Sequence, residues 1–199
     1  SSIVVLPRGG APAQWAVRTG ERETGVTIMR MAHDLDAGDI IAQAATPIDP
    51  DETVVALHDR LAVLGAELLV NVVADIAAGT ATRTPQEHGK ATLAPMLSRE
   101  LSPMDWSRPA RALHNQVRGL IPWPTAVTEL GGNRCKVFST SVRGAATAAA
   151  PGTILAAGKE GIQVACGGGT VLRIDELQAD GGKRMKAADY LRGHPIPVG

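Results

Sequence analysis

The chain has 199 residues, of which 44% are hydrophobic and 20% charged, and its formal net charge is zero. This composition is typical of a soluble globular protein, and the length allows one large domain or two small ones. The longest apolar region, residues 54–78, is interrupted by Asp59, Arg60, Glu67 and Asp75. Such charges are costly in hydrocarbon, so we expect no membrane span and no membrane partner.

The first residues and the two cysteines indicate the cellular compartment and the state of the thiols. The first residues, SSIVVLPRGG, lack a basic region followed by a sustained apolar region, so we expect no signal peptide. The only cysteines, Cys135 and Cys166, have no CxxC spacing. This indicates a reducing, cytoplasmic setting, with both thiols acting as small buried hydrophobes.

The zero net charge hides an asymmetry between the two halves. Residues 1–104 hold 8 Lys and Arg against 13 Asp and Glu, whereas residues 105–199 hold 12 against 7. A polyanionic partner is therefore expected to bind the second half, although a basic face is also often simply solvated.

The first half predicts a strand over residues 24–31, a loop over 32–39 and a second strand over 40–48. A long helix should follow, because Asp49 suits its N-cap and Glu52 completes a capping box. Gly79 should end this helix in the left-handed conformation. The apolar face of the helix consists of Val54, Leu57, Leu61, Leu64, Leu68 and Val72.

The second half follows a stretch rich in Thr, Pro and Gln, residues 83–104, which we expect to be a linker or a strap across a surface. Ser107 should cap a helix over residues 108–120. Short β-like runs then recur, which predicts a small antiparallel barrel. They are TAVTEL, RCKVFSTSV, TILAA, GIQVAC and TVLRIDELQ. Residues 183–193, KRMKAADYLRG, should form a short basic helix.

Three stretches in order resemble the methionyl-tRNA formyltransferase family. They are ETGVTIMRMAHDLDAGDI at residues 23–40, TLAPMLSRE followed by MDWSRPARALHNQVRGLIPWPTA, and GGKRMKAADYLRG near the end. The resemblance covers nearly the whole chain. It implies an α/β fold, an incomplete Rossmann-like formyltransferase domain over residues 1–82, then the linker at 83–104 and an OB-like tRNA-binding domain over 105–199.

The resemblance also implies an activity. The family transfers a formyl group from 10-formyltetrahydrofolate to the amino group of methionyl initiator tRNA, so the expected partners are the folate donor and this tRNA. No metal is expected, and a monomer is expected.

The LDAGD stretch matches the family's LDTGD motif, which implies a catalytic role for Asp36 and donor binding by Leu35, Asp36 and Gly38. Asp36 would orient the catalytic His, and Gly38 would permit a tight turn. From spacing alone, the stretch also fits a turn with solvated carboxylates. A metal loop fits poorly, because Leu35 interrupts the oxygen-ligand pattern.

The family's catalytic Asn-x-His motif is absent upstream of Asp36. Either LPRGGAP is a shortened form of the family's SLLPxxRGAAP, or the catalytic loop is missing between LPRGG and GAPAQ; we favour the second. The chain is then a fragment, a degenerate copy, or a sequence from which segments are missing.

Phosphate binding needs flexible cations on one face. The residues expected to contact tRNA are Arg118, Arg134, Lys136, Lys183, Arg184 and Lys186. The leading hypothesis is the formyltransferase reaction. The alternatives are an RNA-binding module without activity, and a related folate-dependent formyltransferase or hydrolase with another substrate.

Overall fold

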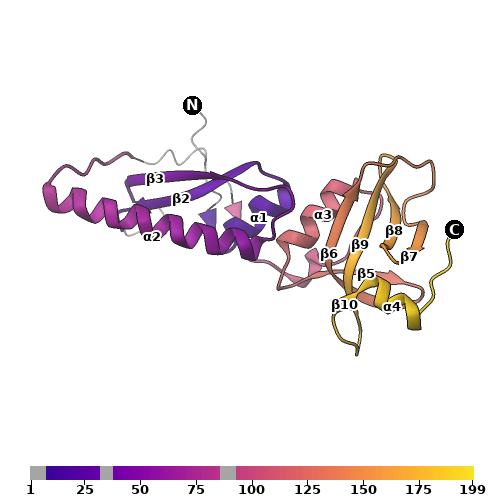
Figure 1. Ribbon diagram of the computed structural model, residues 1–199. Helices are drawn as coiled ribbons and strands as arrows, with labels where there is room; N and C mark the ends of the chain where they lie inside the picture. The colour runs from indigo at the N-terminus through magenta and orange to yellow at the C-terminus, as the bar shows by residue number, and fades with distance from the viewer. Residues whose placement is uncertain (1–7, 32–37, 86–92) are drawn as a thin grey trace. The chain divides into compact units, whose positions relative to one another are not determined.

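The computed structural model describes residues 8–31, 38–85 and 93–199 (Figure 1). The chain divides into two compact units. The first unit holds residues 1–96 except 17–20, and the second unit holds the remainder.

The first unit contains the predicted strand–loop–strand. Strands β2 (Glu23–Met29) and β3 (Ile40–Pro47) pair in antiparallel register (Figure 1). Gly25 is needed in this pair, because a Cβ at that position would lie 2.3 Å from the carbonyl oxygen of Ala44. Any larger residue would therefore push the two strands apart.

Helix α2 (Val54–Ala78) ends as predicted, with Gly79 at φ 71°. Its start was predicted wrongly, because the N-cap is Thr53, whose hydroxyl accepts the backbone N–H three residues on at 3.3 Å. The expected bond between Asp49 N–H and the Glu52 carboxylate does form, at 2.9 Å, but it closes a turn ahead of the helix.

Helix α2 is apolar on more than one face. Of the predicted inner face, Val54, Leu57 and Val72 are buried. Large apolar side chains are also exposed on the same helix, namely Val55, Val63, Leu69, Val70, Val73 and Ile76. The second set has no cover among the described residues.

By length and composition alone, α2 could cross a membrane. An eighteen-residue stretch of the helix has a mean hydropathy of 1.9, no more than two charged residues, and 6% of its residues buried. The expectation that charges exclude a span from this region was therefore too strict, because the charges leave one such stretch open. A single helix of this kind is weak evidence for a membrane.

The stretch predicted as a linker, residues 83–104, is bound to the first unit at two places. Near its start, Thr84 forms an antiparallel bridge to Ile40. Further on, strand β4 (Leu93–Ala94) pairs in parallel with β1 (Arg8–Gly9). This stretch is therefore a strap over the first unit at these points.

A short helix, α1 (Pro12–Thr19), follows β1. The indole N–H of Trp15 donates to the carbonyl of Pro95 at 2.8 Å. No helix was predicted over these residues, because eight residues are too few to establish a helical period.

The second unit is built on an antiparallel sheet, and each of the predicted β-like runs forms one of its strands. The strands are β5 (Ala126–Leu130), β6 (Asn133–Arg143), β7 (Ile154–Gly158), β8 (Gly161–Cys166), β9 (Thr170–Ala179) and β10 (Met185–Lys186). Their order is β5-β6-β9-β8-β7, and β10 also pairs with β9. The predicted small antiparallel β domain is confirmed.

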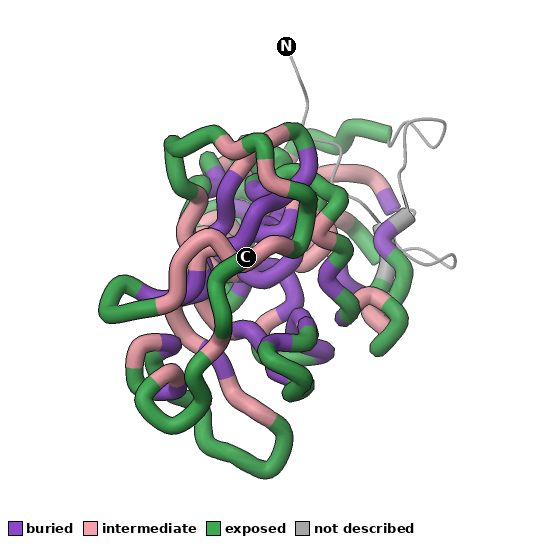
Figure 2. The backbone as a smooth tube through the Cα atoms, turned by 90° about the vertical axis from the view of Figure 1, so that its right-hand side faces the viewer, coloured by how far each residue is buried: buried purple, intermediate pink, exposed green. Residues whose placement is uncertain are grey.

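One hydrophobic core lies between this sheet and helix α3 (Ala110–Gly119). Figure 2 colours the backbone by burial, with the buried segments in purple. Its members with no exposed surface include Leu113, Val137, Ile162 and Leu177. Residues of β6, β9 and α3 thus belong to the same core, and the second unit forms this core from its own residues.

The helix boundaries of the second unit differ from prediction. Ser107 does not cap α3; its hydroxyl donates instead to the Asp105 carboxylate at 2.6 Å, and the N-cap position is Pro109, without a side-chain bond. The terminal helix α4 spans Ala187–Gly193 only, because the residues before it pair with β9 as β10. A 3₁₀ turn, Arg99–Leu101, precedes α3.

Candidate functional site

The loop between β2 and β3 carries the predicted catalytic residue. Asp36 and its neighbour Leu35 lie outside the described residues. Gly38, the third predicted donor-binding residue, is buried just ahead of β3. The base of the loop is closed by a hydrogen bond from Arg30 N–H to the carbonyl of Asp39, at 2.9 Å. The roles of Asp36, Leu35 and Gly38 therefore stay predictions.

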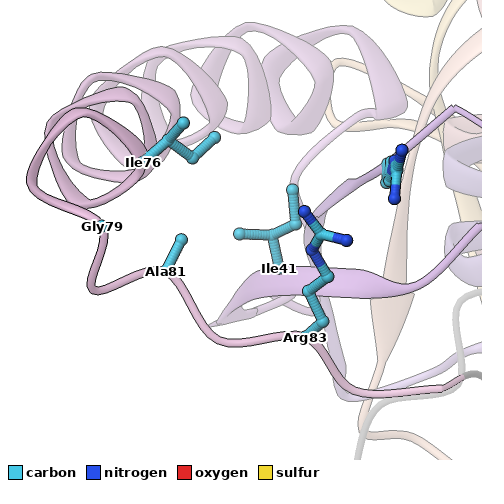
Figure 3. Close-up of a pocket in the computed structure, with 6 residues that line it drawn as sticks. Ile41, Ile76, Gly79, Ala81 and Arg83 are labelled. Atoms are coloured by element: carbon cyan, nitrogen blue, oxygen red, sulfur yellow. The ribbon is translucent and has the colours of Figure 1, made fainter.

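A pocket of about 390 Å³ opens in the first unit, beside the base of this loop (Figure 3). Its lining comes from the end of β2, the start of β3, and the end of α2 with the stretch after it. The lining residues are Arg30, Ile41, Ile76, Gly79, Ala81 and Arg83.

Two arginines and an apolar floor set the chemistry of this pocket. Among the described residues, neither Arg30 nor Arg83 forms an ion pair. Guanidinium groups bind carboxylate and phosphate strongly, so the pocket suits an anion with an apolar body. Sequence reasoning missed it, because Arg30 and Arg83 lie far apart in the chain. No group of three or more His, Cys, Asp or Glu that could hold a metal gathers within the described part.

In the second unit, the predicted cations of β6 share its outer face. Cys135 and Val137 are fully buried. Side chains alternate along a strand, so Arg134 and Lys136 point away from the core, and both residues are exposed.

Strand β9 joins these cations to those of β10. Lys136 lies directly opposite Gln178, and Lys186 lies directly opposite Glu176. Directly opposite residues project from the same face of a sheet. The two lysines therefore flank β9 on one face, and Lys183 lies in the loop that leads into β10.

The arginines on this face are already paired. Arg184 Nη2 lies 2.5 Å from Glu176 Oε2, and Arg134 Nη1 lies 3.7 Å from Asp180 Oδ2. Among the described residues, the three lysines form no ion pair. They are the cations most available to an incoming phosphate.

Arg118 is different from the other predicted cations. It is 5% exposed, and its Nε donates to Asn115 Oδ1 at 2.9 Å. Its Nη2 also contacts the carbonyl of Val17 at 3.5 Å. Because these bonds hold the side chain inside the second unit, we leave Arg118 out of the candidate interface.

Other polar residues of α3 are also structural. His114 Nδ1 lies 2.9 Å from the hydroxyl of Thr140. The amide of Gln116 donates to the carbonyls of Leu101 at 2.8 Å and Pro103 at 3.0 Å. The bonds of Gln116 hold residues 101–103 against helix α3, which explains why a polar face of this helix is buried.

Both cysteines are free and buried, as predicted. Burial raises the pKa of Cys166 to about 11, and it also raises the pKa of Cys135. Both thiols therefore stay protonated near neutral pH, which makes them poor nucleophiles.

Two family models match the chain. The model described as "Formyl transferase" matches residues 5–73, and "Formyl transferase, C-terminal domain" matches residues 96–195. Among the curated relatives, methionyl-tRNA formyltransferase of Trichlorobacter lovleyi is 46% identical over 200 residues, and that of Bacillus subtilis is 45% identical over 199. All of this chain is covered, but only 62% and 63% of those relatives.

Solved structures share the fold at low identity. HypX from Aquifex aeolicus, in complex with tetrahydrofolic acid, matches with a TM-score of 0.74 and 20% identity, over 97% of this chain and 34% of that one. The N-formyltransferase of Helicobacter canadensis matches with a TM-score of 0.70 and 16% identity, over 86% of this chain and 62% of that one. The C-terminal model alone spans half of the chain, and so this chain belongs to the formyltransferase family.

Proposed function

We propose that this chain serves the transfer of a formyl group from 10-formyltetrahydrofolate to the amino group of methionyl initiator tRNA. One observation carries the proposal: the identity of about 45% to methionyl-tRNA formyltransferases extends over the whole chain, and so over both units. We keep the predicted division into a catalytic portion at 1–82, a linker at 83–104 and a tRNA-binding domain at 105–199.

In the proposed reaction, the amino nitrogen attacks the formyl carbon, and the bond from that carbon to the folate nitrogen breaks. The amine loses a proton, and the folate nitrogen gains one. Asp36 is proposed to serve this proton transfer in the way the family's LDTGD aspartate does, by orienting a histidine, although the family's Asn-x-His motif does not occur upstream of Asp36 in this sequence. The loop that carries Asp36 begins and ends on the β2–β3 pair, where Arg30 N–H donates to the carbonyl of Asp39.

The second unit is proposed to hold the tRNA. Its half of the chain has an excess of five positive charges, and Lys136, Lys183 and Lys186 lie on or beside one sheet face, with no ion pair to any residue that the structure describes. Phosphate contacts of this kind position a nucleic acid without reading its sequence. We further propose that the protein is a monomer in the cytoplasm, and the two free cysteines agree with a reducing compartment.

One observation favours a second candidate, an RNA-binding module without transfer activity. The second unit closes its own core, whereas the Asn-x-His motif of the family does not occur upstream of Asp36. On this alternative, tRNA binds and no formyl group moves.

A paired assay separates the two candidates. The purified chain is given 10-formyltetrahydrofolate and methionyl-tRNA, and transfer and tRNA binding are both measured. For the enzyme we expect Asp36→Asn to lower transfer by at least about a hundredfold and to leave tRNA binding unchanged. Asp39→Asn is the matched control, because Asp39 closes the loop through its backbone carbonyl.

The other outcomes separate the remaining possibilities. Salt-dependent tRNA binding without transfer supports the RNA-binding module. Faster transfer to a free amino sugar than to methionyl-tRNA would contradict the proposal that methionyl-tRNA is the substrate. The absence of both transfer and tRNA binding would overturn both candidates.

A further inference from the structure

Phe138, the only phenylalanine of the chain, sits at an irregularity of β6. Val137 lies opposite Leu177 and Ser139 lies opposite Glu176, so Phe138 is an extra residue in the ladder. Such a β-bulge redirects a side chain and is often found beside a functional site. Phe138 is partly buried and is not among the buried residues of the core.

An arginine from the neighbouring hairpin covers this ring. The guanidinium carbon of Arg184 lies 4.6 Å from the centroid of Phe138. Glu176 fixes the same guanidinium, with its Oε2 at 3.0 Å from Nε and 2.5 Å from Nη2. The side chain of Arg184 is nevertheless 53% exposed. It is therefore a flat cation, held on one side by a ring and at its edge by a carboxylate, with surface left for a ligand.

This arrangement differs from that of a phosphate contact. The carboxylate of Glu176 already occupies one hydrogen-bonding edge of Arg184, its Nε and Nη2 groups, so fewer N–H groups remain for a phosphate. The flat face of a guanidinium stacks well on nucleobases, and an aromatic ring beneath it adds to the stack. The free lysines lie on both sides, since Lys136 flanks β9 from β6 and Lys186 flanks it from β10.

We propose that Phe138 and Arg184 form a stacking platform for an unpaired base of the bound RNA, with Lys136, Lys183 and Lys186 holding the adjacent phosphates. The proposal rests on the proposed binding of tRNA by the second unit. It adds a preference for unpaired nucleotides over duplex, because a base inside a helix has no free face to offer.

The test measures binding of the full 199-residue chain to three probes: methionyl-tRNA, a twelve-nucleotide oligoadenylate, and a twelve-base-pair RNA duplex. Arg184→Lys keeps the positive charge and removes the planar guanidinium group. Phe138→Leu keeps an apolar side chain and removes the aromatic ring. We expect each to weaken oligoadenylate and tRNA binding by about tenfold and duplex binding by less than about twofold. Arg192→Lys is the matched control, because Arg192 also pairs with a carboxylate, Asp189 of α4, and among the described residues it makes no ring contact.

Salt dependence separates stacking from charge. Lys136→Ala should reduce the slope of log affinity against log salt by about 0.7, whereas Phe138→Leu should leave that slope unchanged. If the unaltered chain binds tRNA but Arg184→Lys and Phe138→Leu bind all probes as it does, the platform is wrong and tRNA binding stands. If both variants weaken duplex and single strand equally, the pair only supports the hairpin, and the platform is again wrong. If the unaltered chain binds none of the probes, the proposed function itself fails.

Discussion

The two units bury their apolar side chains to very different extents. In the second unit, α3 packs on the sheet, and residues such as Leu113, Ile162 and Leu177 have no exposed surface. In the first unit, α2 buries three residues against its hairpin and leaves others exposed, with Val70 at 70% and Val63 at 60%. One unit is thus a closed domain, and the other presents a long apolar face that no residue in the described part of the chain covers.

This difference shows that a helix hydrophobic on several sides needs cover on several sides. The hairpin β2–β3 is only two strands wide and reaches one side of α2. The curated relatives are longer, since this chain spans about 62% of their length. The stability of the two units should therefore respond differently to the same kind of substitution.

The largest expected effect comes from removing a leucine from the closed core. Leu113→Ala should lower the free energy of unfolding of the second unit by about 3 kcal/mol, since it removes a fully buried side chain and leaves a cavity. Leu69→Ala on α2 should change stability by less than about 0.5 kcal/mol, because Leu69 is 48% exposed and alanine favours a helix.

Hydrogen exchange of peptides from β9 and from α2 measures the two units separately. A similar loss of protection for both substitutions would contradict the difference between the two units. It would mean that the outer face of α2 is covered in solution, for example by a second copy of the chain.

A smaller effect tests how the helices begin. Thr53→Ala should lower the stability of α2 by about 1 kcal/mol, because its hydroxyl accepts a backbone N–H of the first turn. Ser107→Ala should lower the stability of α3 by less, since Ser107 bonds to Asp105 and makes no cap. Exchange rates at the first turn of each helix report both changes, and equal losses would show that Ser107 caps α3 in solution.

The sequence predicted the elements of the second unit well, because β-like runs between glycine turns depend on local chemistry. It predicted helix starts less well. Asp49 and Glu52 do form the expected bond, but Thr53 offers a second cap one turn later, and the sequence alone does not rank the two. Likewise, Lys186 read as helical from its neighbours, whereas pairing with Glu176 places it in a strand.

The predicted tRNA contacts stay predictions, and the structure separates them by their exposure. Lys136 and Lys186 lie on one sheet face, as a phosphate-binding surface requires. Arg118 is buried and not exposed, and this could not be predicted, because its burial depends on partners from elsewhere in the chain, such as Val17. The stack of Arg184 on Phe138 was also beyond prediction, since a bulge and a hairpin register create it.

The smallest expected effect concerns alkaline pH and the closed unit alone. Cys166 has a pKa of about 11 when folded, raised by burial from an ordinary value near 9. The folded state therefore keeps its proton where the unfolded state has lost it, so this contribution to stability is complete below pH 9 and falls as pH rises toward 11. Between pH 8 and 9.5 the free energy of unfolding of the second unit should fall by roughly 0.5–1 kcal/mol through this thiol.

Urea unfolding followed by circular dichroism at both pH values measures the loss, with Cys166→Ala as the variant that cannot titrate there. If the variant loses as much stability as the unaltered chain, the Cys166 thiol is not the group responsible, and the buried Cys135, whose pKa is also raised, becomes the next to replace.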